Sequence, residues 1–80
     1  MATSWVESDG ALRRRFQFAD FSEAFAFMTR VALLAEAKGH HPDWSNSWNT
    51  VDIAFTTHSA VSTVTDADRA MAAAIDELLA

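Results

Sequence analysis

Residues 21–38, FSEAFAFMTRVALLAEAK, constrain the fold more than any other stretch of this sequence. The run is rich in Ala, Leu and Glu and poor in β-branched residues, a composition that favours a helix. Asp20 can cap its start, and Glu23 stands in the position of a capping box. Gly39 supplies a left-handed stop, and Pro42 follows shortly after it. We therefore predict one long helix over residues 21–38.

The predicted helix is apolar around most of its circumference. Its apolar positions form two stripes, Phe21, Phe25, Met28, Ala32 and Ala35 in one and Ala24, Phe27, Val31 and Leu34 in the other. A helix this apolar needs more cover than one sheet face provides. In a chain of 80 residues, a second copy is the obvious cover, so we predict a homodimer or a homotetramer.

Two hairpins are expected, one before this helix in the chain and one after it. Residues 4–18 contain the turn signal Asp9-Gly10, followed by a run in which apolar and polar residues alternate. Residues 43–58 alternate again, and we expect a strand over residues 43–48 that turns at Asn49-Thr50. This alternation gives each strand one apolar face and one solvent-exposed face, which is typical of an antiparallel sheet.

A last helix follows a polar loop. Thr65 can cap it, Asp68 stands at its third position, and its expected buried stripe is Ala70, Met71, Ala74, Ile75 and Leu78. The element order is then β-β-α-β-β-α. This order predicts an α+β fold, a four-stranded antiparallel sheet with the helices packed on one face. We expect residues 1–80 to form a single domain.

Composition excludes several classes of function. Six Lys and Arg against eleven Asp and Glu give a net charge of −5, so nucleic acid is not an expected partner. There are no cysteines, which excludes disulfides and thiolate metal sites. The N-terminal residues lack a signal-peptide pattern, and no apolar run is long enough to span a bilayer. We therefore expect a cytoplasmic protein with no membrane partner.

The three histidines of the chain all fall at the ends of predicted elements. His40 and His41 follow the stop of the first helix, and His58 closes the last strand, so one pocket could hold all three. Imidazole titrates near pH 6.5, which suits it to give and take protons at neutral pH. Simple helix capping or solvent exposure is the plainer alternative for the pair. A metal site is the other alternative, although adjacent histidines chelate awkwardly. Trp44 and Trp48 are by themselves typical of core or interface.

These residues also occur together at a fixed spacing. The pattern Glu36–x3–His40–His41–Pro42–x5–Trp48–x9–His58–x9–Asp68 resembles the signature of the pterin-4a-carbinolamine dehydratases, also called 4a-hydroxytetrahydrobiopterin dehydratases. The flanking stretches FQFADFSEAFAFMTRVALLAEAKGHHPDW and WNTVDIAFTTH are similar to the strands and central helix of that family. The likeness runs from about Trp5 to the C-terminus. Six positions at fixed spacing make it far more specific than a lone motif.

The resemblance implies an enzyme that removes water from 4a-hydroxytetrahydropterin to give the quinonoid dihydropterin, as part of pterin cofactor recycling. It implies no metal and no cofactor, and a link to an aromatic amino-acid hydroxylase. The catalytic residues would be His40, His41 and His58. The substrate-binding residues would be Glu36, Pro42, Trp44, Thr57, Ser59 and Asp68, with the two carboxylates orienting histidines or the ring.

Such a dehydration needs one proton given to the leaving oxygen and one taken from N5, which is general acid–base work. Our hypothesis is that His58 accepts the proton and that His40 or His41 is the acid. The alternative function is a non-catalytic module of the same fold, which binds pterin or serves as a dimerisation coactivator. That alternative would use the broad apolar helix as its interface.

The chain departs from the family pattern in two places. It begins four residues ahead of Trp5, so the N-terminal helix usual in the family is expected to be absent. The loop 59–64 contains no glycine, whereas the corresponding loop of the family is commonly glycine-rich. A left-handed turn in this loop would strain a β-branched residue.

Overall fold

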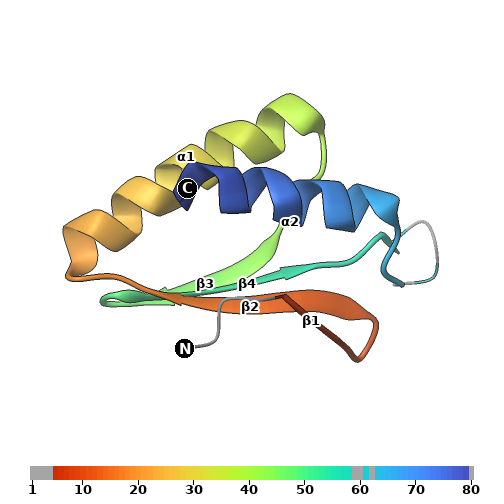
Figure 1. The fold of residues 1–80 in the computed structure, drawn as a ribbon, viewed down its shortest axis with the longest axis horizontal. Helices are drawn as coiled ribbons and strands as arrows, with labels where there is room; N and C mark the ends of the chain where they lie inside the picture. The colour runs from red at the N-terminus through yellow and green to blue at the C-terminus, as the bar shows by residue number, and fades with distance from the viewer. Residues whose placement is uncertain (1–4, 59–60, 62, 80) are drawn as a thin grey trace.

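The structure is a computed structural model, and it describes residues 5–58, 61 and 63–79. Its elements in chain order are β1 (Val6–Ser8), β2 (Ala11–Gln17), α1 (Phe21–Lys38), β3 (Asp43–Ser47), β4 (Thr50–Phe55) and α2 (Asp66–Leu79). Both helices cover the same face of the sheet (Figure 1). The predicted α+β architecture is therefore confirmed, with the predicted element order.

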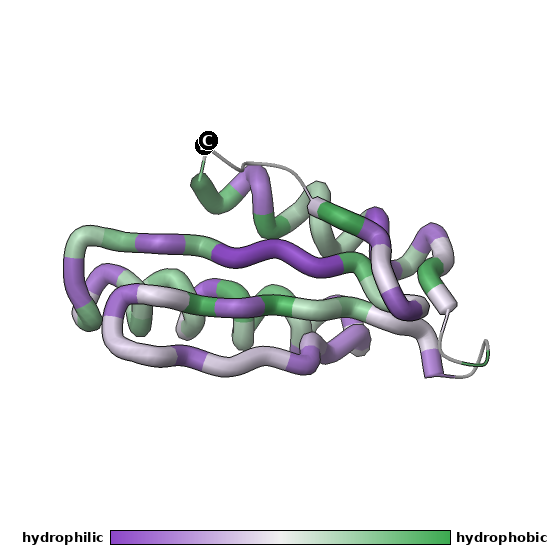
Figure 2. The backbone as a smooth tube through the Cα atoms, turned by 90° about the horizontal axis from the view of Figure 1, so that it is seen from below, coloured by the Kyte–Doolittle hydropathy of each residue, from purple (hydrophilic) through white to green (hydrophobic). Residues whose placement is uncertain are grey.

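The four strands form one antiparallel sheet in the order β1-β2-β4-β3. The register aligns Arg14 of β2 and Trp44 of β3 with Ile53 of β4, so these three positions share the helix-covered face. Alternate positions, such as Arg13 and Arg15, lie on the face without helices, which Figure 2 views from below. This separation follows from the period of two along each strand.

The core lies between the sheet and the two helices. Its buried members come from β2, β4 and both helices: Phe16, Ala24, Phe27, Val31, Ala35, Val51, Ile53, Phe55, Met71 and Ile75. One charged residue, Arg14, also points to this face, and its Nη1 lies 2.7 Å from Oδ1 of Asp76. Trp5 donates its indole N–H to the same oxygen at 2.9 Å. The inward guanidinium is therefore paired, and the pairing ties β2 to α2.

The predicted ends of α1 are confirmed. The side chain of Asp20 accepts a hydrogen bond from the amide of Glu23 at 2.8 Å, and Gly39 adopts a left-handed φ of 66°. Of the two apolar stripes, the one containing Phe27 and Val31 faces the sheet, together with Ala24 and Ala35. The other stripe leaves Phe21 47% and Phe25 55% exposed, and Leu33, outside both stripes, is 69% exposed.

The predicted turn between the last two strands is wrong by one residue. Ser47 pairs with Thr50, so the turn is Trp48-Asn49 and β3 ends before Trp48. The side-chain amide of Asn46 donates to the backbone carbonyls of Trp48 and Thr50, at 3.1 and 2.8 Å. These bonds hold Trp48 at a φ of 50°, with its side chain largely exposed. Local amide contacts therefore set this turn, and periodicity does not reveal them.

The last helix begins as expected, and its predicted buried stripe is confirmed in part, at Met71 and Ile75. It starts at Asp66, directly after Thr65, and its buried residues are Asp68, Met71, Ala72 and Ile75. Ala70 and Leu78, which were expected inside, are exposed. Among the described residues, no helix combines the length and the apolar character that crossing a membrane would require.

Candidate active site

Three segments far apart in sequence meet at one end of the molecule. They are the C-terminal end of α1, the end of β4 and the start of α2 (Figure 1). The left-handed Gly39 turns the chain, and the amide of His40 donates to the carbonyl of Ala35 at 3.2 Å. Beyond β4, the amide of Thr57 donates to the carbonyl of Thr63 at 3.0 Å. The turn after α1 and this bridge position the side chains described next.

A buried carboxylate, that of Asp68, joins the three segments. Asp68 has 0% exposure, and its Oδ1 lies 2.6 Å from Nε2 of His40. Its Oδ2 accepts the backbone N–H of Thr65 at 2.8 Å and the hydroxyl of Thr57 at 2.8 Å. A buried charge of this kind is tolerated because each of its oxygens has donors.

The pKa of Asp68 records this balance. Burial by itself raises the pKa, because it penalises the charged form. The hydrogen bonds from His40, from the Thr65 amide and from Thr57, together with the charge of His40, more than offset that effect. The pKa therefore lies below its ordinary value, and Asp68 is a carboxylate at neutral pH. Its position in the first turn of α2 adds the favourable field of the helix N-terminus.

The imidazole of His40 is held on its face as well as at its edge. It stacks on the ring of Phe55, with centroids 5.7 Å apart and planes inclined by 14°. Its side chain is 20% exposed, so one part of the ring still reaches solvent. This histidine is thus oriented and accessible, the combination that general acid–base catalysis requires.

The other two histidines lie in more open surroundings. His41 places Nε2 2.9 Å from Oε1 of Glu36, and both side chains are largely exposed. His58 is exposed and directly follows Thr57, and its side chain makes no hydrogen bond to any described residue. The structure therefore joins His40 and Thr57 through Asp68, and His41 and His58 follow these two residues in the chain.

Pro42 and Trp44, two of the predicted substrate-binding residues, make no side-chain hydrogen bond to this cluster. Pro42 is half-buried between the histidine pair and β3, and Ser59 lies outside the described residues. Trp44 packs partly buried against the core and also borders a hollow of about 640 Å³.

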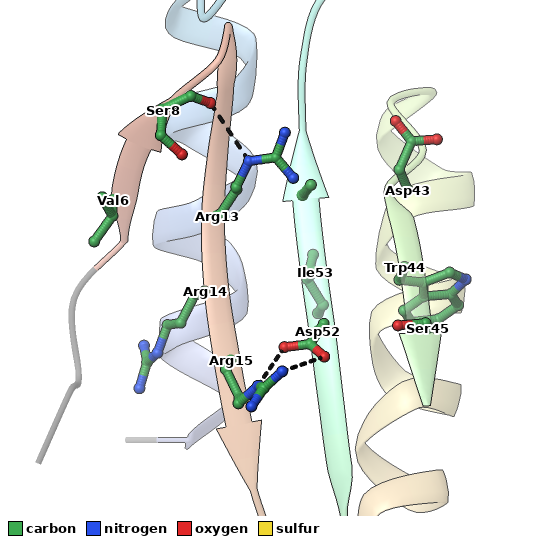
Figure 3. A pocket seen from close by; sticks show the side chains of 11 residues that line it. Val6, Ser8, Arg13, Arg14, Arg15, Asp43, Trp44, Ser45, Asp52 and Ile53 are labelled. Atoms are coloured by element: carbon green, nitrogen blue, oxygen red, sulfur yellow. Dashed lines mark hydrogen bonds and ion pairs between the residues drawn. The ribbon is translucent and has the colours of Figure 1, made fainter. Parts of the chain in front are cut away.

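That hollow lies on the open face of the sheet, with the helices behind the strands (Figure 3). Arg15 makes two hydrogen bonds to Asp52 there, at 2.7 and 3.2 Å, and Arg13 bonds the carbonyl of Ser8 at 3.4 Å. None of the described residues that line it is a histidine. The histidines, which are the candidate acid–base groups, lie outside this hollow. We therefore take the cluster of His40, Thr57 and Asp68 as the candidate site.

Sequence reasoning missed Thr65 as a member of the site. Its hydroxyl lies 2.6 Å from that of Thr57, and its amide donates to Asp68. The available signal was its place as a helix cap three residues before a carboxylate, a spacing that commonly brings the two into contact. Within the described part of the chain, no three His, Cys, Asp or Glu side chains are grouped so that they could hold a metal ion.

Comparison with known proteins finds a family match over nearly the whole chain. Residues 1–78 match the family model described as pterin 4 alpha carbinolamine dehydratase. The chain belongs to this family. The resemblance read from the histidine spacing is therefore confirmed.

Individual relatives cover most of the chain. A protein of Synechococcus sp. WH7803 is 57% identical over 74 residues, which are 92% of this chain and 78% of that protein. A protein of Rhizorhabdus wittichii is 58% identical over 76 residues, 92% of this chain and 77% of its own length. Both carry the name "Putative pterin-4-alpha-carbinolamine dehydratase".

Two solved structures share the fold. A transcriptional coactivator/pterin dehydratase from Brucella melitensis is 43% identical with a TM-score of 0.87, over 92% of this chain and 80% of that one. A pterin dehydratase-like protein identified as a RuBisCO assembly factor in the alpha-carboxysome is 29% identical with a TM-score of 0.80. That match covers 95% of this chain and 89% of the other. The descriptions of these two similar structures therefore include roles other than dehydration.

Proposed function

We propose that this protein dehydrates 4a-hydroxytetrahydropterin to the quinonoid dihydropterin by general acid–base catalysis with histidines. The C4a–O bond breaks as the hydroxyl oxygen takes a proton and leaves as water. N5 gives up its proton, and the C4a=N5 double bond forms. The two proton transfers balance, so the reaction consumes neither an electron nor a co-reactant.

The observation that carries this proposal is the contact between His40 and the buried Asp68. An ionised carboxylate 2.6 Å from Nε2 fixes the ring and stabilises its positive charge whenever it holds the extra proton. A catalytic acid or base gains from such a fixed orientation, because the entropy cost of aligning the ring is met before the proton is transferred. Structural histidines at helix ends do not require a fully buried carboxylate.

We assign the remaining roles by contact and chain position. Glu36 orients His41 through their 2.9 Å contact, which makes this histidine a second proton donor or acceptor. His58 is the proposed proton acceptor for N5, and its exposure leaves it free to meet a ligand. Pro42, Trp44 and Ser59 are proposed to line the pterin, with no metal or cofactor taking part.

A stopped-flow assay of 4a-carbinolamine decay tests the activity. We expect the wild-type protein to accelerate decay in proportion to its concentration, with saturation in substrate. Each well-placed acid or base contributes about 10²–10⁴-fold, so the effect is well within reach of the method. Pterin binding without acceleration would reject the enzyme and leave a binding protein.

A second candidate function is supported by the outer surface of α1. Phe21, Phe25 and Leu33 are exposed on it, and the names of two solved relatives include a coactivator and an assembly factor. A non-catalytic module would use this surface to bind another protein. Full dehydratase activity in a chain whose outer α1 surface has been made polar would show that the two roles are separable.

We further propose that the protein acts as a homodimer or homotetramer, with the exposed face of α1 covered by another copy. Exposed large apolar side chains of this number mark an interface more often than a free surface. Its substrate would come from an aromatic amino-acid hydroxylase, the class of enzyme that leaves a hydroxyl on C4a. The place of action would be the cytoplasm.

A further inference from the structure

Asp68 is the centre of a hydrogen-bond chain whose proton order the contacts determine. Thr57 lies 2.8 Å from Oδ2 of Asp68, and the carboxylate can only accept, so the single hydroxyl proton of Thr57 points to Asp68. The hydroxyls of Thr57 and Thr65 are 2.6 Å apart. Since the proton of Thr57 is already committed, Thr65 is the donor of that bond. The order is therefore Thr65 to Thr57 to Asp68.

The reverse order fails on the same distances. If Thr65 donated directly to Asp68, it would do so over 3.4 Å, which is long for a hydroxyl bond to a carboxylate. Thr57 would then donate to Thr65 and leave two unshared acceptors facing each other at 2.8 Å. With the backbone N–H of Thr65 also at 2.8 Å, Oδ2 is fully occupied. Only Oδ1 remains for His40.

This arrangement decides which nitrogen of His40 carries a fixed proton. An ionised Oδ1 at 2.6 Å requires a donor, so Nε2 of His40 holds a proton whether the ring is neutral or charged. The stack on Phe55 fixes the plane of the ring, and the contact with Oδ1 selects Nε2 within that plane. Nδ1 has no hydrogen-bond partner among the described residues, and it is the nitrogen left to meet a ligand.

We propose that Thr57 and Thr65 are positioning residues that act through Asp68 to hold His40 in the Nε2–H tautomer, so that Nδ1 is the nitrogen offered to substrate. The inference rests on the proposed dehydratase function for its catalytic consequence. The neutral ring would accept a proton at Nδ1, and the charged ring would donate one from the same atom. Neither threonine touches the reacting atoms in this scheme.

Histidine ¹⁵N NMR of the whole chain tests the tautomer without any substrate. In the wild type at a pH where His40 is neutral, we expect its signals to show a protonated Nε2 and an unprotonated Nδ1. In T57V and T65V, which remove a hydroxyl at nearly constant shape, we expect a mixture of tautomers. T57S and T65S, which keep the hydroxyl, should restore the wild-type pattern.

Steady-state kinetics test the consequence for catalysis. We expect kcat to fall by about ten-fold in T57V and T65V, with KM changed less than two-fold, because ring orientation matters in the transition state more than in binding. T29V, on the exposed side of α1, is the matched control and should leave kcat unchanged.

A wild-type His40 protonated at Nδ1 would overturn the proposal, and so would T57V and T65V that keep both tautomer and kcat. If a valine variant fails to fold, T57A or T65A, which also lacks the hydroxyl, is compared with its serine variant instead. An inactive wild type with the Nε2–H pattern lost in T57V would reject dehydration while supporting the positioning role. The two failures are therefore distinguishable.

Discussion

At the scale of single residues, the chemistry is concentrated in one buried carboxylate. Asp68 receives donors from three segments and has no exposure to water. Such a group is costly to bury alone, and its value lies in what it holds in place. Here it holds the imidazole of His40, which makes the charge of Asp68 the first property to test.

Replacing Asp68 with Asn should lower both activity and stability. The amide keeps the shape but places an NH₂ among donors, so we expect a loss of about 1–3 kcal/mol in the free energy of unfolding at pH 7. We expect kcat to fall at least ten-fold, as the tautomer of His40 is no longer fixed. Urea denaturation and the decay assay measure the two effects. An unchanged kcat would contradict the role given to Asp68.

The same variant predicts a pH dependence. The pKa of Asp68 is lowered in the folded protein, so its stabilising contribution is present above the unfolded pKa of about 3.9 and is lost as the pH falls through the folded pKa. The stability difference between wild type and D68N should therefore shrink as the pH falls below the unfolded pKa of Asp68. A difference that grows on acidification through that range would reverse the sign and refute the explanation.

A second residue-scale prediction concerns Val61, which has a φ of 58° and a largely exposed side chain. A β-branched residue in this left-handed region costs about 1–2 kcal/mol. Glycine removes that strain but loses about 0.5–1 kcal/mol in chain entropy. We expect V61G to be more stable, with a rise in Tm of roughly 2–5 °C by scanning calorimetry. V64G, where φ is not positive, should lower Tm instead.

At the scale of elements, the helix ends are encoded locally. Gly39 ends α1 with a φ of 66°, and a Cβ built there would meet no atom within 4 Å. The cost of alanine is therefore conformational alone. We expect G39A to lose about 1 kcal/mol of stability, and G39N to lose less because Asn tolerates the left-handed region. Chemical denaturation measures both, and equal stability of G39A and wild type would contradict this.

The same locality explains what the sequence could predict. The cap at Asp20, the stop at Gly39 and the turn at Asp9-Gly10 each depend on neighbours in the chain, and all were predicted. The apolar stripe that faces the sheet was not, because α1 is apolar on most sides and only packing selects Phe27 over Phe25. Short side-chain contacts shifted the Trp48 turn in a similar way.

The site was predictable in part for the same reason. The spacing from Glu36 to Asp68 indicated the family, since a motif is a property of the chain. The part played by Thr65 was not, because its hydroxyl acts through Thr57, a residue that lies beside it only in the folded sheet and helix. Tertiary hydrogen bonds leave no periodic signal.

At the scale of the whole molecule, the outer surface of α1 predicts self-association. Light scattering at micromolar concentration should give a mass two or four times the 8.8 kDa of the chain. F25D should lower the measured mass toward the 8.8 kDa of one chain, because a charge buried in an apolar contact is costly. A73D, which places the same charge at an exposed position of α2, is the control. A wild type that stays monomeric would contradict the proposed interface.

The whole account depends on histidines that move protons at one end of a small α+β layer. Initial rates of 4a-carbinolamine dehydration by the wild type and by H40A, H41A and H58A test this most directly. We predict that the wild type accelerates the reaction and that each substitution lowers kcat/KM by about 10²-fold or more, with folding intact by circular dichroism. Three variants that all retain the wild-type rate would contradict it.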